Sequence, residues 1–308
     1  MTSICVGAGR STTDESVVGT RLARSGLSPI SESMRYRSFL IPLLFTSLCA
    51  SILACEVGED EERALGADAA AQVDSAMPFV TDPEVTAYFS TLGTALANAS
   101  DDRERQWRFR VVDAAEVNAF ALPGGFVYVN RGLIDRAGNV SELAGVLGHE
   151  IAHVVLRHSA ERLEKAQKTN VGVSLVCALT SLCSSDAARV AINVGGAALF
   201  ARFSRQDEFE ADSAAVGITT RAGYHPDGIA TMFSKLLRDR EQQPDIVSGW
   251  FASHPLEEDR IMGVRRVIEG ASLPDSARLT RDDPEFRAFQ ERLRALPAPP
   301  ARRSATVP

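Results

Sequence analysis

Hydrophobic residues recur at two spacings along the chain, and each spacing predicts a different kind of element. Spacings of three and four residues predict helices in four stretches: from Pro83 onward, Glu142–Arg157, Ile229–Arg240 and Glu285–Leu296. Alternation of hydrophobic and polar residues predicts a strand at Trp107–Val112. A second predicted strand, Phe126–Val129, follows the turn residues Leu122-Pro123-Gly124-Gly125. The pattern predicts an α+β fold that is mainly helical and carries a small sheet.

The predicted helix Glu142–Arg157 contains the sequence His-Glu-Ile-Ala-His at residues 149–153. Four residues turn a helix by about 400°, so His149 and His153 lie on one face, about 6 Å apart along the axis. Two imidazoles placed in this way can bind one Zn²⁺ ion, with Glu150 beside them as the general base of a metalloprotease. Ser141 is the expected N-cap of this helix. The motif predicts zinc-dependent peptide hydrolysis.

An acidic stretch, residues 204–212, offers a third zinc ligand. Glu208 and Asp212 are four residues apart and therefore share one helix face, whereas Glu210 points about 200° away from it. A site of two histidines and one carboxylate needs a carboxylate on the metal and benefits from another that orients a histidine. The spacing of Glu208 and Asp212 fits these two roles, and it also fits a solvated helix face.

Length, charge and cysteine content narrow the functional classes. The chain has 308 residues, enough for one large domain or two small ones. A formal net charge of −7 and a pI near 5.4, with dispersed Lys and Arg residues, argue against a nucleic-acid partner. Five cysteines, three of them before residue 56, fit neither a disulfide scaffold nor a cysteine-rich zinc site.

The N-terminal part has the pattern of a bacterial lipoprotein precursor. Residues 1–33 are polar, and we expect them to be disordered or to be an upstream extension from a misassigned start codon. Residues 34–54 are a predicted signal peptide, in which two arginines precede the hydrophobic run Phe39–Leu53. A small residue before Cys55 resembles a lipobox, so we expect a lipid on Cys55. The alternative is a plain N-terminal anchor helix.

The rest of the chain divides by composition. Residues 55–78 are acidic and alanine-rich, which predicts a flexible tether between the lipid and the domain. Residues 79–296 carry the helical and strand patterns and are the predicted metallopeptidase domain. Residues 297–308 are rich in proline, alanine and arginine, which predicts a disordered tail.

Two strongly hydrophobic stretches, Val171–Cys183 and Ala187–Phe203, follow the motif helix. They are short for membrane spans, so we favour a buried or membrane-surface helical hairpin over two spans. An oxidising compartment would favour a disulfide between Cys177 and Cys183. On one continuous helix they are too far apart for it. We therefore predict a helix break and a disulfide; the alternative is an unbroken helix with two free thiols.

Several motifs together resemble the gluzincin metallopeptidases of the family of HtpX and the prenyl-protein-processing CAAX endopeptidases. The resemblance extends from about Asp82 to Pro297. The motifs that carry it are Asn118–Gly125, Gly148–His153, Arg157-His158, Ser204–Asp212 and His254–Arg260. It implies a mainly helical zincin-like domain with a small sheet whose edge strand faces the zinc. With the signal peptide, it points to the lipid-anchored periplasmic branch of the family, which acts in envelope protein quality control.

The resemblance also implies a role for individual residues. His149 and His153 match the first two zinc ligands, Glu150 the catalytic base and Glu208 the third ligand. Asp212 matches a carboxylate that orients a histidine ligand, and His254 matches a histidine that approaches the metal as an occluding or transition-state group. We expect His254 or Arg260 to stabilise the oxyanion.

The sequence excludes His158 as a ligand of the same zinc ion, and it excludes membership of the metzincin family. His158 lies nine residues after His149, about 180° around a continuous helix, so it cannot share the zinc. We expect it to support the site indirectly or to lie on the surface. A metzincin needs a glycine and a third histidine where this chain has Leu156 and Ser159.

The sequence therefore predicts a zinc endopeptidase, with one zinc ion per chain, that cleaves unfolded or misassembled envelope proteins. The substrate is expected to bind as an extra strand along the sheet edge near Asn118 to Phe120. The expected location is the periplasmic side of a membrane, with the outer membrane favoured. The alternative is a holdase or assembly factor whose zinc site is structural or plugged by His254.

Overall fold

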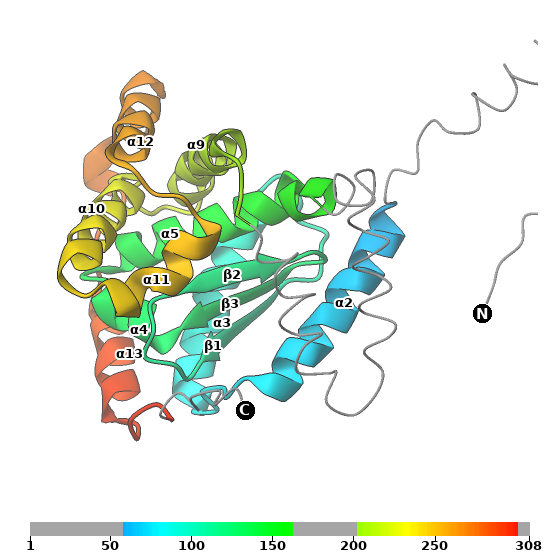
Figure 1. Ribbon diagram of the computed structural model, residues 1–308. Helices are drawn as coiled ribbons and strands as arrows, with labels where there is room; N and C mark the ends of the chain where they lie inside the picture. The colour runs from blue at the N-terminus through cyan, green and yellow to red at the C-terminus, as the bar shows by residue number, and fades with distance from the viewer. Residues whose placement is uncertain (1–57, 163–201, 301–308) are drawn as a thin grey trace, which may run out of the picture. The chain divides into compact units, whose positions relative to one another are not determined.

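Helices pack on both faces of a small sheet in the computed structural model, which describes residues 58–162 and 202–300 (Figure 1). The helices and strands are α2 (Glu59–Ala76), α3 (Pro83–Asn98), β1 (Arg108–Val112), β2 (Ala119–Leu122), β3 (Phe126–Asn130), α4 (Arg131–Arg136), α5 (Val140–Val155), α9 (Arg205–Arg221), α10 (Asp227–Gln242), α11 (Pro244–Ser253), α12 (Glu258–Gly270), a 3₁₀ turn (Ser276–Arg278) and α13 (Pro284–Ala295). This mainly helical α+β architecture confirms the predicted fold class.

The three strands have the order β1-β3-β2, with β1 parallel and β2 antiparallel to β3. Strands β1 and β3 confirm the two predicted strands. Strand β2 was not predicted, because Ala119–Leu122 is hydrophobic throughout and lacks the alternation that marks a half-buried strand. Strand β2 lies at an edge of the sheet and packs against α5. This is the expected position of the edge strand, beside the helix that carries His149 and His153.

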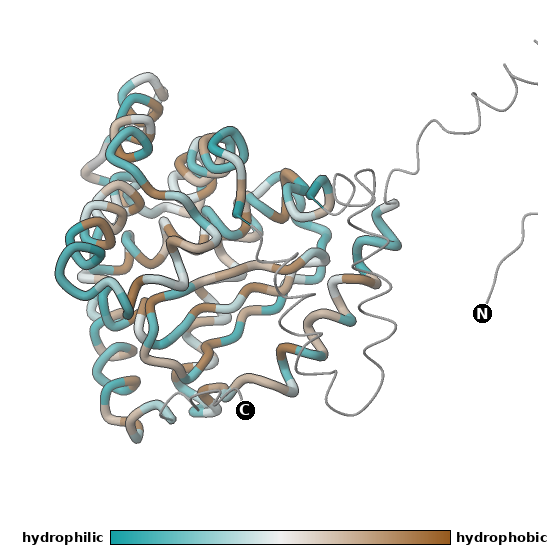
Figure 2. Tube along the Cα trace, viewed as in Figure 1, coloured by the Kyte–Doolittle hydropathy of each residue, from teal (hydrophilic) through white to brown (hydrophobic). Residues whose placement is uncertain are grey.

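The sheet separates two hydrophobic clusters, because successive side chains of a strand point to opposite faces. One face carries Val111, Val127 and Val129 into the main core with α3 and α5. The other face carries Phe120 and Tyr128 toward α2. In Figure 2, by contrast, the outer helices α10 and α12 change between hydrophilic and hydrophobic along each turn, which is the pattern of helices packed on one side only.

Helix α5 is buried along almost its whole length, with Val155 as its one residue that is not fully buried. Its glycines permit this burial: a Cβ on Gly145 would lie 2.7 Å from the backbone nitrogen of Ile229 in α10. The N-cap is Asn139, whose side chain accepts a hydrogen bond from Glu142 N at 3.1 Å. The prediction of Ser141 as the N-cap is therefore wrong, because the helix begins at Val140, two residues earlier than predicted, and Ser141 is its second residue.

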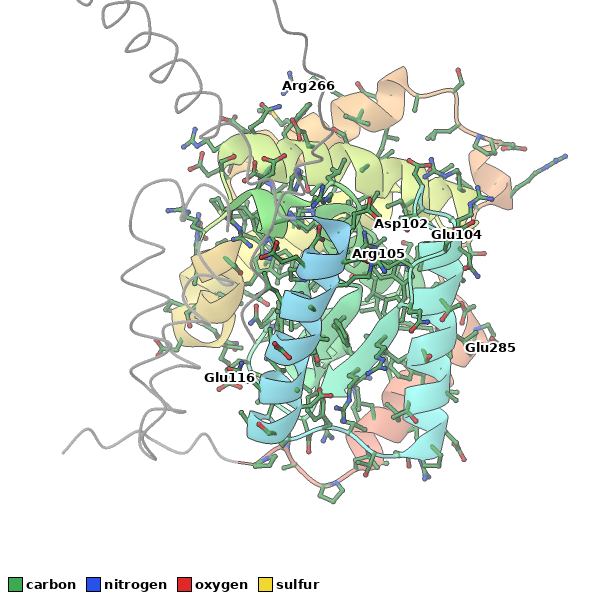
Figure 3. All side chains as sticks on the ribbon, turned by 90° about the vertical axis from the view of Figure 1, so that its right-hand side faces the viewer. Asp102, Glu104, Arg105, Glu116, Arg266 and Glu285 are labelled. Atoms are coloured by element: carbon green, nitrogen blue, oxygen red, sulfur yellow. The ribbon has the colours of Figure 1, made fainter. Side chains whose placement is uncertain are left out.

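Residues 59–76 form helix α2, so the predicted flexible tether is wrong for this segment. Small residues at helical spacing, Gly66, Ala69 and Ala70, are buried and let the helix approach the sheet closely. At Gly66 the contact is with the β2–β3 turn, where an added Cβ would lie 1.8 Å from the carbonyl oxygen of Pro123. Figure 3 shows α2 lying over this face of the sheet. Composition suggested a tether, whereas the spacing of the small residues favours packing.

The other predicted helices are confirmed with small shifts of their ends. Asp82 caps α3 by accepting hydrogen bonds from the backbone of Glu84 and Val85. Helix α11 was not predicted. The hydrophobic hairpin, except for its last two residues, and the pair Cys177 and Cys183 lie outside the described residues. Among the helices of the described ranges, none has the length and hydrophobicity that crossing a membrane requires.

The docking of α2 can be tested with Gly66→Ala. Alanine favours a helix by about 1 kcal/mol over glycine, so this change would stabilise an isolated α2. Because the new Cβ would collide with Pro123, we expect α2 to leave the sheet and limited proteolysis within residues 59–76 to become faster. Gly270→Ala is the control, because its Cβ meets no atom within 4 Å. Equal protection of α2 in both variants would contradict the packing.

Candidate metal centre

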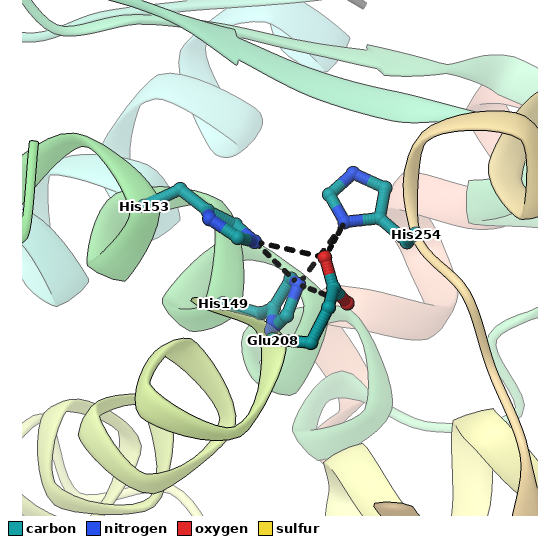
Figure 4. Close-up of side chains that lie close together, drawn as sticks. All are labelled: His149, His153, Glu208 and His254. Carbon is teal, nitrogen blue, oxygen red and sulfur yellow. Dashed lines mark hydrogen bonds and ion pairs between the residues drawn. The ribbon is translucent and has the colours of Figure 1, made fainter. Parts of the chain in front are cut away.

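Four buried side chains from three parts of the fold converge beside α5 (Figure 4). His149 and His153 lie one turn apart on α5, and Glu208 lies in the first turn of α9. His254 follows the last residue of α11. The nitrogen and oxygen atoms that these residues offer lie within 4.8 Å of one another. The structure therefore brings together the predicted ligands His149, His153 and Glu208, and adds His254 to the cluster.

The spacing of these atoms fits a single zinc ion. His149 Nε2 lies 3.0 Å from His153 Nε2 and 3.3 Å from His254 Nδ1. Glu208 Oε1 lies 3.0 Å from His254 Nδ1 and 3.5 Å from His153 Nε2. Ligands about 2.0–2.1 Å from a tetrahedral Zn²⁺ are about 3.3 Å apart. The donor types and the distances both match zinc.

Asp212 and Arg260 support the site from the side away from the ligand atoms. Asp212 Oδ1 lies 2.9 Å from His149 Nδ1, which directs the other ring nitrogen toward the cluster. Arg260 donates two hydrogen bonds to the Asp212 carboxylate, at 2.8 and 2.7 Å, and also contacts Glu208. Burial alone would lower the pKa of His149, but the carboxylates of Asp212 and Glu208 raise it above its ordinary value.

Glu150 is a buried acid–base group next to the cluster. Its Oε1 lies 3.5 Å from His254 Nε2 and accepts no hydrogen bond from the part of the chain that the structure describes. Burial raises the pKa of Glu150 above its ordinary value. A carboxylate with a raised pKa and an unused lone pair is suited to proton transfer.

His158 lies against His153 because the helix breaks before it. Arg157 has φ of 58°, in the left-handed region, and helical turns resume at His158. The angle that placed His158 opposite His149 assumed a continuous helix and does not apply. His158 is buried, and its Nδ1 lies 2.9 Å from His153 Nδ1, on the side of that ring away from the ligand cluster. It is not among the ligands, as predicted, but it is not on the surface either.

Two aromatic contacts and one role were not predicted from the sequence. Phe203 stacks on His153 with 3.8 Å between ring centroids, and Trp250 stacks on His254 at 4.6 Å. In the sequence, Phe203 directly precedes Ser204 and Trp250 lies shortly before His254, and only this proximity could have indicated the two contacts.

Arg260 was expected at the oxyanion, but its guanidinium is directed at Asp212 and Glu208 and also donates to the carbonyl of Pro255. The oxyanion role of Arg260 is therefore not supported.

Comparison with known proteins gives a consistent result. The model of Peptidase family M48 matches residues 83–268, more than half of the chain. The beta-barrel assembly-enhancing protease of Escherichia coli (strain K12) is 28% identical over 260 residues, which are 82% of this chain and 52% of that protein. Metalloprotease LoiP of the same organism is 27% identical over 223 residues, 72% of this chain and 86% of LoiP. The mitochondrial metalloendopeptidase OMA1 of Schizosaccharomyces pombe is 29% identical over 188 residues, 61% of this chain and 54% of OMA1.

The chain spans about half the length of the beta-barrel assembly-enhancing proteases that it matches. The matched range 83–268 includes the edge strand β2, both histidines of α5, the acidic first turn of α9, His254 and Arg260. The resemblance inferred from the motifs is thereby confirmed at the level of the family, as is the zincin-like domain with its small sheet. The chain belongs to Peptidase family M48.

Proposed function

We propose that this protein is a zinc-dependent endopeptidase. The observation that carries the proposal is the Glu150 carboxylate, which is buried, lacks a hydrogen bond to its Oε1 within the described ranges, and lies next to a cluster that fits zinc. Three protein ligands and one adjacent carboxylate are the elements that metal-assisted peptide hydrolysis requires. The family match and the metalloprotease names of the relatives support the same activity.

The proposed ligands are His149, His153 and Glu208. These three residues would hold a Zn²⁺ ion, which would supply Lewis acidity for lowering the pKa of a water molecule and polarising a peptide carbonyl. Glu150 takes the proton from the attacking water through Oε1 and delivers it to the leaving amine. Asp212 keeps His149 in the orientation and tautomer that a ligand needs. Arg260 holds Asp212 and Glu208 in place rather than contacting the substrate.

Helix α11 contacts the start of the proposed substrate edge, which lies near Asn118 to Phe120. Ile246 of α11 accepts a hydrogen bond from Val117 N at 2.8 Å, and Gly249 packs against the side chain of Asn118. His254 directly follows the same helix. We propose that α11 moves as a unit when a substrate strand binds, and that His254 leaves the ligand cluster with it. His254 then acts as an occluding group, which is one of the two roles expected for it from the sequence.

We further propose that the protein acts in the cell envelope on unfolded or misassembled proteins. Support for this location comes from the predicted signal peptide, from the expected lipid on Cys55, and from the names of the relatives that act in beta-barrel assembly. The periplasmic side of a membrane, with the outer membrane favoured, and the absence of a nucleic-acid partner are part of the same proposal.

The alternative function is a holdase or assembly factor with a permanently plugged zinc site. The position of His254 Nδ1, 3.3 Å from His149 Nε2, favours it, because a catalytic zinc must keep one position open. A protease and a holdase differ in whether the intact wild-type protein cleaves an unfolded substrate.

Glu150→Gln is expected to retain zinc and to lose cleavage of unfolded casein by about 10²–10⁴-fold, because the amide cannot accept the proton. The measurements are casein fragments by electrophoresis and zinc by atomic absorption. A chelator should abolish the wild-type activity, and added zinc should restore it. Absence of cleavage by the zinc-loaded wild type would support the holdase.

Glu208→Gln is expected to abolish tight zinc binding, because the variant loses the charged ligand that lies among the ligand atoms. Glu210→Gln is the matched control on the same helix. Its carboxylate contacts His158 instead of the cluster, and the amide oxygen can still accept a hydrogen bond. The measurement is the zinc content of the two purified variants. Equal loss in both variants would contradict the assignment of Glu208.

His254→Ala is expected to retain zinc and to increase casein cleavage, because the proposed occluding group is removed. Trp250 packs on the His254 ring, so the unfolding temperature should be measured alongside to control for stability. A fall in cleavage with normal zinc content would instead assign His254 to oxyanion stabilisation. Complete loss of zinc would contradict both roles.

A further inference from the structure

The two histidine ligands differ in the group that contacts the ring nitrogen facing away from the proposed metal. For His149 that group is the carboxylate of Asp212, at 2.9 Å. For His153 it is the imidazole of His158, also at 2.9 Å. We propose that His158, held by Glu210, is the positioning residue for His153. This inference rests on the proposed zinc site and adds two residues to it.

The tautomers follow from the proposed zinc site. His153 Nε2 lies 3.0 Å from His149 Nε2, among the ligand atoms, so as a zinc ligand it presents a lone pair there and carries its proton on Nδ1. The Nδ1 atoms of His153 and His158 are 2.9 Å apart and share that one hydrogen, so His153 donates and His158 accepts. His158 then carries its own proton on Nε2.

Glu210 stabilises this tautomer of His158. The Nε2–H group of His158 faces Glu210 Oε2 at 3.4 Å. The other oxygen of Glu210 accepts a hydrogen bond from Gln206 at 2.6 Å, which fixes the carboxylate on the surface of α9. A continuous donor chain thus leads from His153 through His158 to Glu210. It performs for His153 what Asp212 performs for His149, with an imidazole inserted between the ligand and the carboxylate.

The backbone places His158 for this contact. Arg157 adopts a positive φ, which is uncommon for a residue other than glycine, and the turn that it forms brings His158 back toward α5. Glu62 of α2, only 2% exposed, accepts a hydrogen bond from Arg157 Nε at 2.7 Å. Helix α2 therefore helps to hold the turn that sets the position of His158.

The test compares four variants of the full chain: His158→Ala, His158→Asn, Glu210→Ala and the control Glu269→Ala, which removes an exposed carboxylate on α12. Zinc dissociation constants are measured by competition with a chromophoric chelator, and the absorption spectrum of the Co²⁺-loaded protein reports the ligand geometry. We expect His158→Ala to weaken zinc binding by about 10–100-fold and to change the Co²⁺ spectrum. Glu210→Ala should show a smaller loss in the same direction, and Glu269→Ala none.

His158→Asn distinguishes positioning from simple packing, because the asparagine side-chain oxygen can accept the hydrogen bond from His153 at nearly the same place. We expect it to recover most of the affinity that alanine loses. Wild-type zinc affinity in both His158→Ala and Glu210→Ala would overturn the proposal, as would equal losses in His158→Asn and His158→Ala. If His158→Ala fails to fold, as judged by its metal-free unfolding temperature, Glu210→Ala and His158→Asn decide alone. A wild-type protein without bound zinc would instead refute the proposed function.

Discussion

The close packing of α5 against α9 is the constraint on which the metal centre depends. The two helices supply three of the four clustered ligand residues, so their separation sets the distances within the site. Small residues make the approach possible: a Cβ on Gly148 would lie 3.2 Å from the Thr219 side chain and 3.6 Å from the carbonyl of Ala215. At this separation Glu208 and Asp212, one turn apart on α9, reach the two nitrogens of the His149 ring.

Burial of so many polar groups would be costly if they did not compensate one another. Burial opposes ionisation of Glu208, yet His254 and Arg260 hold its pKa well below its ordinary value. The Arg260 guanidinium contacts both buried carboxylates, Glu208 and Asp212, and so compensates part of their negative charge.

How far the sequence predicts the structure depends on whether a property is local. The helix that carries His149 and His153 follows from spacing along the sequence and did not need the tertiary structure. Spacing also places Glu208 and Asp212 on one helix face, whereas the prediction of Glu208 as a ligand rested in addition on the resemblance to the family. The break at Arg157 could not be predicted, because a leucine followed by an arginine is compatible with a continuing helix. The left-handed turn there is accompanied by a contact with α2, some 95 residues earlier in the sequence.

The errors at α2 and β2 have a related cause. An acidic, alanine-rich stretch and a uniformly hydrophobic tetrapeptide are each ambiguous when taken alone, and their structures are fixed where they meet. Phe120 and Leu122 of β2 share a cluster with Ala69 and Ala70 of α2, so the helix and the edge strand stabilise each other. The composition of either segment does not reveal this contact, because it joins residues that are about 50 positions apart in the sequence.

Helix α11 connects the metal centre with the proposed substrate edge. The helix contacts the chain at Val117 and Asn118, immediately before β2, and His254 follows its last residue. Its Trp250 is buried, stacks on the His254 ring and lies 6.2 Å from the Phe233 ring of α10, so α11 and His254 pack together against α10. Under the proposed movement of α11, a strand that pairs with the start of β2 would displace the helix and withdraw His254 from the ligand atoms. A substrate that failed to pair with this edge would then leave the site closed, which would limit the proposed hydrolysis to chains that can adopt an extended strand.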